Sequence, residues 1–230
     1  MFLSRIKPEP GFVVSQLTER ANAGDAYAQH QLLWQLFATH KNRGFLFRYE
    51  QSAQGLCYYV LSSSEPEQDV AGISLSCKPF MPKLSAGDVL AYNLRANPTR
   101  MLKAEKMGKR GPRVDVLMHA KHLAREAGES SDKVEALQYQ AARDWLSSAH
   151  RQEAMGVEFI SEPEVTEYQQ HQVRKASNGK SNRGLIQFSS VNFQGLLRVV
   201  EPSRFIDSLN QGIGRAKSMG CGLMMIRRAN

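Results

Sequence analysis

The chain has 230 residues, of which 42% are hydrophobic and 23% charged, so it can bury the core of one large domain or two small ones and is not mainly disordered. Its 30 Lys and Arg exceed its 22 Asp and Glu, and the net charge of +8 favours polyanionic partners. No apolar run approaches the length of a membrane span, and Arg5 and Lys7 interrupt any signal-like start. Cys57, Cys77 and Cys221 have no pair spacing, so we expect reduced thiols and a cytoplasmic location.

The first half combines short apolar runs with one helical pattern. A strand is predicted over residues 2–6, and Asp25 can cap a helix that runs to about Thr39. The order β-α-β-β-α-β that results is that of a ferredoxin-like unit, which we place at residues 1–97. Its remaining predicted elements are strands over 44–49 and 56–61, a weakly helical stretch over 62–87 and a strand over 88–95.

The second half, residues 98–230, predicts the same order of elements without a sequence repeat. It opens with a basic loop over 99–113 and a short strand over 114–118. Asp132 and Glu135 have the spacing of a capping box, and the helix that follows directs Trp145 to the core. Near the end, a strand over 196–200, a helix from Pro202 and a strand over 223–226 complete the unit.

A β-hairpin is predicted inside this second unit. Its arms cover residues 165–175 and 183–193, and the turn between them is rich in Ser, Asn and Gly. The predicted fold class is therefore α+β, with tandem ferredoxin-like (RRM-like) domains and an inserted basic β-hairpin in the second.

The segment from Gly212 to Gly222 carries two glycine pairs around five residues. A helix cap followed by a tight turn would explain Gly212 alone. Four glycines that flank Arg215 and Lys217 also fit backbone that approaches an anion closely. The residues leave both interpretations open, but the spacing is not that of a Walker loop, so nucleotide binding fits poorly.

Four segments, in order along nearly the whole chain, resemble the CRISPR repeat-processing endoribonucleases, in particular the CasE subfamily of the type I-E Cascade complex. The glycine-rich segment, with Arg-Ala-Lys-Ser-Met inside it, resembles the C-terminal loop of this family. The other three are Met1-Phe-Leu-Ser-Arg-Ile6, Tyr27-x-x-His30-x-x-Leu33-Trp34-x-Leu36-Phe37 and Leu94-Arg95-Ala96-Asn97-Pro98.

Tyr27 and His30 lie three residues apart and share one face of the predicted helix. The residues alone favour a histidine at the edge of the core over a catalytic one. The resemblance implies the opposite, because Tyr-x-x-His is where the family carries its catalytic histidine and helper tyrosine. Gln35 stands where some relatives carry a further basic residue, which leaves the cation at that position open.

The resemblance implies metal-independent cleavage of CRISPR precursor RNA at the base of the repeat stem-loop, by attack of a ribose 2′-hydroxyl. No cofactor or metal is predicted, since His119 and His122 lack partners at zinc-site spacing. Whether His30 acts as general base or general acid stays open.

The resemblance also implies the partners, which are the CRISPR repeat RNA hairpin and other Cascade subunits, among them the backbone subunit next to the 3′ end of the guide RNA. No membrane partner is expected. The expected RNA-binding residues are Arg174, Lys175, Lys180 and Arg183 on the hairpin, and Gly212, Gly214, Arg215, Lys217, Ser218, Gly220 and Gly222 in the glycine-rich segment.

Two other functions compete with this one. A non-catalytic tandem RRM-like subunit would hold an RNA hairpin without cutting it, and aromatic pairs exposed on both sheets would favour it. A ribosome- or DNA-associated basic protein fits the charge but not the four ordered segments.

Overall fold

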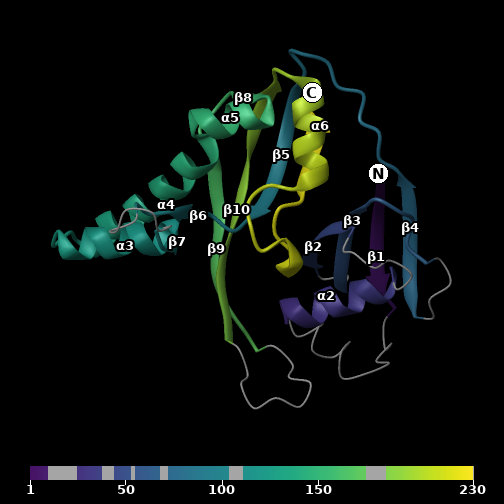
Figure 1. The fold of residues 1–230 in the computed structure, drawn as a ribbon, viewed down its shortest axis with the longest axis horizontal. Helices are drawn as coiled ribbons and strands as arrows, with labels where there is room; N and C mark the ends of the chain where they lie inside the picture. Colours follow the sequence, from purple (N-terminus) through teal and green to yellow (C-terminus); the bar gives the residue numbers. More distant parts are fainter. Residues whose placement is uncertain are drawn as a thin grey trace.

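The computed structural model describes residues 1–9, 25–37, 44–52, 55–67, 72–103, 111–174 and 185–229. Two antiparallel sheets, each with its own helices, make up most of it (Figure 1). Within these ranges, no helix is both long and apolar enough to cross a membrane.

The first sheet belongs to the N-terminal part of the chain. Its core lies between the sheet and helix α2 (Ala26–Gln35), where Leu33, Phe47 and Tyr58 are almost fully buried. The strands lie in the order β2-β3-β1-β4. Their bounds are β1 Phe2–Pro8, β2 Phe45–Ser52, β3 Gly55–Ser62 and β4 Ile73–Pro79.

The second sheet has the order β11-β5-β10-β8, and β9 pairs with β10 alongside it. Leu94, Phe193 and Phe205 lie at the centre of its core. Its strands are β5 Val89–Ala96, β8 Val157–Phe159, β9 Glu164–Arg174, β10 Leu185–Val199 and β11 Met224–Arg228. The helices of this half are α3 Val116–Glu126, α4 Ser131–Ser147, α5 Ala149–Met155 and α6 Pro202–Gln211.

Both sheets share one strand arrangement. If the main strands of each sheet are numbered by their order in the chain, the first sheet, β2-β3-β1-β4, has the spatial order 2-3-1-4. The second sheet, read from its β8 edge as β8-β10-β5-β11, has the same order, 2-3-1-4. The duplication predicted from the order of elements is therefore present in the sheets, as expected for tandem ferredoxin-like units. A small apolar cluster joins the halves, because Leu46 and Leu61 of the first sheet pack with Leu223 of the second half.

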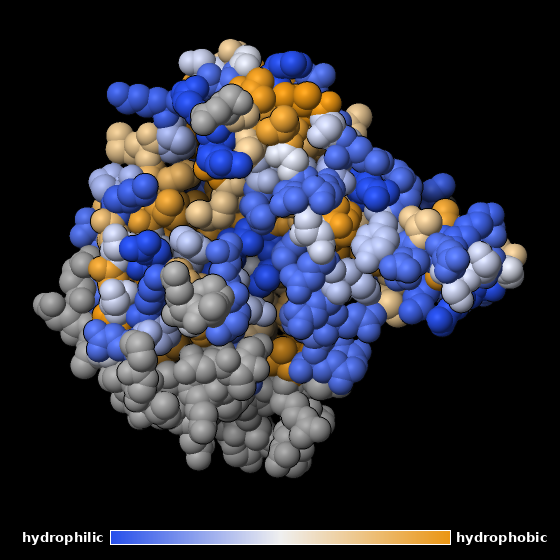
Figure 2. Space-filling model, turned by 180° about the vertical axis from the view of Figure 1, so that it is seen from behind, coloured by the Kyte–Doolittle hydropathy of each residue, from blue (hydrophilic) through white to orange (hydrophobic). Residues whose placement is uncertain are grey.

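Helices α3 and α4 form an arm that projects from the body (Figure 1). Seen from behind, the surface of this arm is mostly hydrophilic (Figure 2). At its base, β6 (Thr99–Met101) pairs with β7 (Arg113–Asp115), so the ends of the predicted basic loop form a short ladder.

Four of the sequence predictions that differ from the structure concern which elements form, where they begin and which sheet they join. The stretch 62–87, predicted as weakly helical, contains strand β4, in which Ile73, Leu75 and Cys77 alternate with polar residues at the period of a strand. The strand predicted over 88–95 is present as β5 but lies in the second sheet. Sheet membership therefore changes between β4 and β5, upstream of residue 97.

The other two differences concern helix starts. The strand predicted over 114–118 ends at Asp115, because the carboxylate of Asp115 accepts a hydrogen bond from the Met118 N–H (2.9 Å) and so starts α3. The predicted capping box is absent, since Ser130 occupies the N-cap of α4 without a side-chain hydrogen bond. Trp145 is buried, as predicted, and its indole donates to the carbonyl of Thr99 (3.1 Å).

Candidate active site

Helix α2 presents the predicted catalytic pair. Asp25 caps it as predicted, since one carboxylate oxygen accepts from the N–H groups of Tyr27 (3.0 Å) and Ala28 (3.1 Å). The helix ends at Gln35, earlier than the predicted Thr39, which itself lies outside the described residues. Tyr27 and His30 are both half-buried, so each keeps part of its side chain accessible.

Aromatic rings surround the imidazole of His30. Its ring centroid lies 5.8 Å from those of Trp34 and Phe45 and 6.3 Å from that of Phe47, with which it is stacked. Trp34 comes from the same helix, and the two phenylalanines come from β2. These contacts hold the ring on an apolar surface with its Nε2 buried, while the residue as a whole stays half-buried. The environment therefore suits a structural histidine, and proton transfer needs a ring nitrogen that the RNA can reach.

The glycine-rich segment returns to this place from the other half of the chain. After α6 ends, a 3-10 turn, η1 (Lys217–Met219), lies against both α2 and β2. Gly220 has a positive φ of 80°, and a Cβ at this position would lie 3.4 Å from the ring of Phe47. Because Phe47 also touches His30, the fold brings the predicted catalytic helix and the predicted RNA-binding loop to one ring.

The predicted cations of the loop differ in their environment. Arg215 is exposed, whereas Lys217 is half-buried and its ammonium donates to the carbonyl of Gln211 (2.6 Å). This contact holds Lys217 against the C-terminal end of α6, where a cation is favourable. Ser218 is half-buried within η1, and Gly212 caps α6 with its N–H on the Ser208 carbonyl (2.9 Å). Gly214 and Gly222 lie in the same segment with positive φ.

The predicted hairpin cations lie at or beyond the end of the described ribbon. Strands β9 and β10 pair antiparallel, from the pair of Glu164 with Gln194 to the pair of Arg174 with Leu185. This pairing confirms that the two predicted arms of the hairpin are adjacent strands. Lys175, Lys180 and Arg183 lie outside the described residues, as does the side chain of Arg174. Their role, and the hairpin as an insertion, therefore stay predictions.

Sequence reasoning missed a buried cation that joins the two halves. Arg48 on β2 is 3% exposed, and its guanidinium donates to the side-chain oxygen of Asn93 on β5 (2.7 Å). Burial lowers the pKa of Arg48, while the nearby Glu50 (3.3 Å) opposes that shift. The sequence did contain a sign of this buried cation, because Arg48 stands among the apolar residues of the strand predicted over 44–49.

The described residues show no arrangement of three or more His, Cys, Asp or Glu side chains that could hold a metal ion. His122 instead lies on the exposed face of α3, with its imidazole 3.5 Å from the Glu126 carboxylate.

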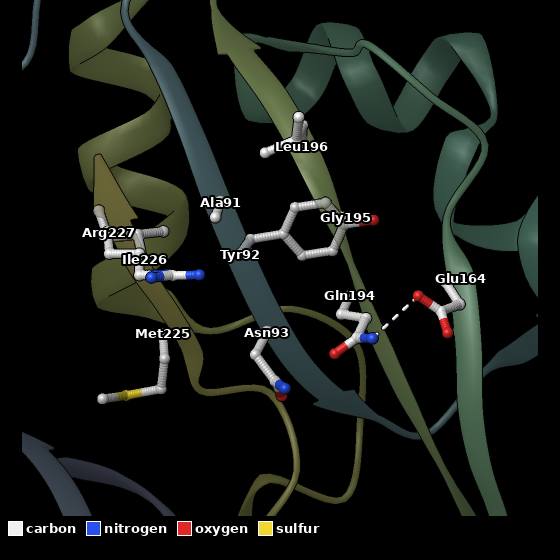
Figure 3. Close-up of a pocket in the computed structure, with 10 residues that line it drawn as sticks. All are labelled: Ala91, Tyr92, Asn93, Glu164, Gln194, Gly195, Leu196, Met225, Ile226 and Arg227. Atoms are coloured by element: carbon white, nitrogen blue, oxygen red, sulfur yellow. Dashed lines mark hydrogen bonds between the residues drawn. The ribbon is translucent and has the colours of Figure 1, made fainter. Parts of the chain in front are cut away.

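A groove of about 570 Å³ lies elsewhere, on the second sheet (Figure 3). Residues of β5, β10 and β11 line it, together with Glu164, whose carboxylate accepts from the Gln194 amide (2.8 Å). None of its lining residues comes from α2 or the glycine-rich segment, so this groove is separate from the candidate active site.

Comparison with known proteins identifies the family. A sequence model of the family described as CRISPR associated protein matches residues 1–228. The chain belongs to this family.

Two relatives and a solved structure place the chain within the family. The CRISPR system Cascade subunit CasE of Escherichia coli (strain K12) is 30% identical over 213 residues, which cover 90% of this chain and 94% of that protein. The CRISPR-associated endoribonuclease Cse3 of Thermus thermophilus is 28% identical over 65% of this chain and 60% of its own length. A solved structure of CRISPR endoribonuclease Cse3 bound to 19 nt RNA has a TM-score of 0.71 at 25% identity, covering 99% of this chain and all of that one. These matches confirm the predicted family and the α+β class with tandem ferredoxin-like domains.

Proposed function

We propose that this protein is a metal-independent endoribonuclease that cleaves CRISPR precursor RNA at the base of the repeat stem-loop. The observation that carries the proposal is the meeting of α2, with Tyr27 and His30, and the glycine-rich segment at Phe47, in a chain of this family. The names of its relatives, an endoribonuclease and a Cascade subunit, support the same activity.

The reaction is an in-line transfer within the RNA. The 2′-hydroxyl upstream of the scissile bond attacks the phosphorus as it loses its proton to a base, and the bond to the 5′ oxygen breaks as that oxygen gains a proton. The products are a 2′,3′-cyclic phosphate and a 5′-hydroxyl. His30 carries out one of these proton transfers, for which the usual histidine pKa of about 6.5 is suited. Tyr27 orients the phosphate from the same helix face.

Recognition rests on the shape and charge of the RNA stem. A-form RNA has a deep, narrow major groove that a flat protein surface reads poorly, so a projecting ribbon is the better probe. Strands β9 and β10 supply such a ribbon, and Arg174, Lys175, Lys180 and Arg183 at its end hold the stem. Arg215 and Lys217, in the glycine-rich segment, bind the backbone phosphates.

The protein keeps its hairpin product and enters Cascade with it, next to the backbone subunit at the 3′ end of the guide RNA, in the cytoplasm. The relative that supports this assembly is the CasE subunit of Escherichia coli, which the chain matches over 90% of its length.

The test is incubation of the purified protein with its repeat RNA in excess EDTA, followed on a denaturing gel. We expect one cut, and an upstream product that resists 3′-end ligation until its cyclic phosphate is opened and removed. An absolute requirement for added Mg²⁺ or Mn²⁺ would contradict the chemistry. Tight binding without any cut, in either buffer, would favour the non-catalytic RNA-binding subunit.

A further inference from the structure

Arg95 on β5 contacts three separate parts of the molecule. Its side chain is only 12% exposed, so the charge is held within the protein and not presented to solvent. It lies on the strand that forms the centre of the second sheet, between β10 and β11.

The first contact is with β2, the strand beneath the candidate active site. The Arg95 guanidinium lies 4.7 Å from the ring centroid of Tyr49 and donates to the Tyr49 carbonyl (3.4 Å). Tyr49 follows Phe47 by two residues, so both side chains lie on the same face of β2. Gly220 packs beside both of their rings.

The second contact is with the β9–β10 ribbon. The Nε of Arg95 donates to the side-chain oxygen of Asn192 on β10 (2.9 Å), and one terminal nitrogen lies 3.8 Å from the carboxylate of Glu167 on β9. The Asn192 amide in turn donates to Glu167 (2.6 Å), which closes a three-residue network on the ribbon.

The third contact is with the glycine-rich segment. The backbone carbonyl of Arg95 accepts from the N–H of Gly222 (2.7 Å), and the Gly222 carbonyl accepts from the N–H of Ile213 (2.9 Å). These two hydrogen bonds tie both ends of the segment to β5.

We propose that Arg95 is a positioning residue, which sets the distance and angle between the surface that holds the RNA and the helix that carries His30. The inference rests on the proposed function. The planar guanidinium reaches Tyr49, Asn192 and Glu167 at once, which an ammonium does not. The contact with the glycine-rich segment is made by the backbone carbonyl of Arg95 and remains in any variant. Because in-line transfer depends on sub-ångström placement, loss of this junction should slow the chemical step more than it weakens RNA binding.

The test compares Arg95→Met and Arg95→Lys with Arg198→Met as the control. Arg198 also lies in the second sheet and also pairs with a glutamate, Glu158 (2.7 Å), but contacts neither β2 nor the glycine-rich segment. Three quantities are measured for each protein: the single-turnover cleavage rate at saturating repeat RNA, the affinity for a 2′-deoxy-substituted RNA that cannot be cut, and the thermal unfolding midpoint.

We expect both Arg95 variants to cleave roughly 10- to 100-fold more slowly at saturating RNA. Their affinity should stay within about threefold of the wild type, because the cations that contact phosphates remain. Arg198→Met should cleave at the wild-type rate. A purely structural role would lower the unfolding midpoint without this separation of rate from affinity.

Wild-type rates in folded Arg95 variants, or equal losses of rate and affinity, would overturn the inference. If Arg95→Met does not fold, Arg95→Lys decides by the same criteria, since it retains the charge and the aliphatic stem. Failure of the proposed function is distinguishable, because in that case the wild-type protein itself does not cut the RNA.

Discussion

The imidazole of His30 is stacked on the ring of Phe47, with 6.3 Å between their centroids. This pair links a helix to a neighbouring strand, and Gly220 packs beside the same ring although it lies more than 170 positions after Phe47 in the chain. The geometry of the candidate active site therefore depends on the packing of the glycine-rich segment.

Gly220→Ala tests this dependence. Its φ of 80° is a conformation that costs an L-residue about 1–2 kcal/mol, so the free energy of unfolding should fall by that amount. Relief of this backbone strain would shift the glycine-rich segment against Phe47, which the added methyl group would contact at 3.4 Å. We therefore expect cleavage to slow by about tenfold or more, in line with the sensitivity of such reactions to placement.

Gly128→Ala is the matched control for Gly220→Ala. Gly128 has a φ of 73°, follows α3 and has open space around its Cβ position. The free energy of unfolding of Gly128→Ala, measured by urea denaturation, should fall by a similar amount to that of Gly220→Ala. The Gly128→Ala protein should nevertheless cleave at the wild-type rate. Equal cleavage by the two variants would show that the glycine-rich segment does not shape the active site.

The hairpin cations should control affinity more than rate. Replacing Lys175 and Lys180 by Ala should weaken RNA binding and reduce the salt dependence of binding by roughly one unit of slope per lost phosphate contact. Salt titrations with uncleavable RNA measure this. The control variant changes Lys103 and Lys106 in the basic loop; if it loses as much affinity and slope, binding is a diffuse effect of the net charge of +8.

His171 should make stability depend on pH. Its imidazole is stacked on Phe188 (4.5 Å) and lies 2.8 Å from the Ser190 hydroxyl. Burial lowers the pKa of His171, as does the charge of Arg95, while Glu167 opposes them. The unfolded chain thus takes up the proton more readily. The neutral, buried imidazole therefore adds to the free energy of unfolding above about pH 6.5, the ordinary histidine pKa. That stabilisation is lost as the pH falls from about 6.5 toward the lower pKa that His171 has in the folded protein.

Urea unfolding between pH 5 and pH 8 measures this contribution. The non-titrating His171→Gln variant should show a flatter fall in the free energy of unfolding toward acid than the wild type. Identical pH dependence in the two proteins would remove His171 as its source.

The sequence predicted what local chemistry determines. Asp25 starts α2 as expected because an N-cap acts on the next three residues. The alternating arms of the ribbon were likewise recognisable as strands. One boundary inside β10 was wrong, since the strands predicted over 183–193 and 196–200 both overlap a single strand, Leu185–Val199. Gly195 lies inside this strand, where the ring of Tyr92 covers it from the neighbouring strand.

The pairing of strands that are distant in the chain could not be predicted from the sequence. The apolar run of β5 would suit either sheet, and only its pairing with β10 and β11 assigns it to the second. The same holds at the candidate site. Tyr27 and His30 were found by resemblance, whereas the convergence of Phe47, Gly220 and Arg95 joins parts of the chain whose contacts no spacing predicts.

The proposed mechanism depends on proton transfer by His30 during RNA cleavage. The most direct measurement is the single-turnover rate of His30→Ala at saturating repeat RNA in EDTA, beside His122→Ala, which removes a histidine from the exposed face of α3. General acid–base groups contribute about 10²–10⁴ in rate, so His30→Ala should be slower by that factor with RNA affinity retained, and His122→Ala should match the wild type. Cleavage by His30→Ala at the wild-type rate would show that His30 takes no part in the proton transfers.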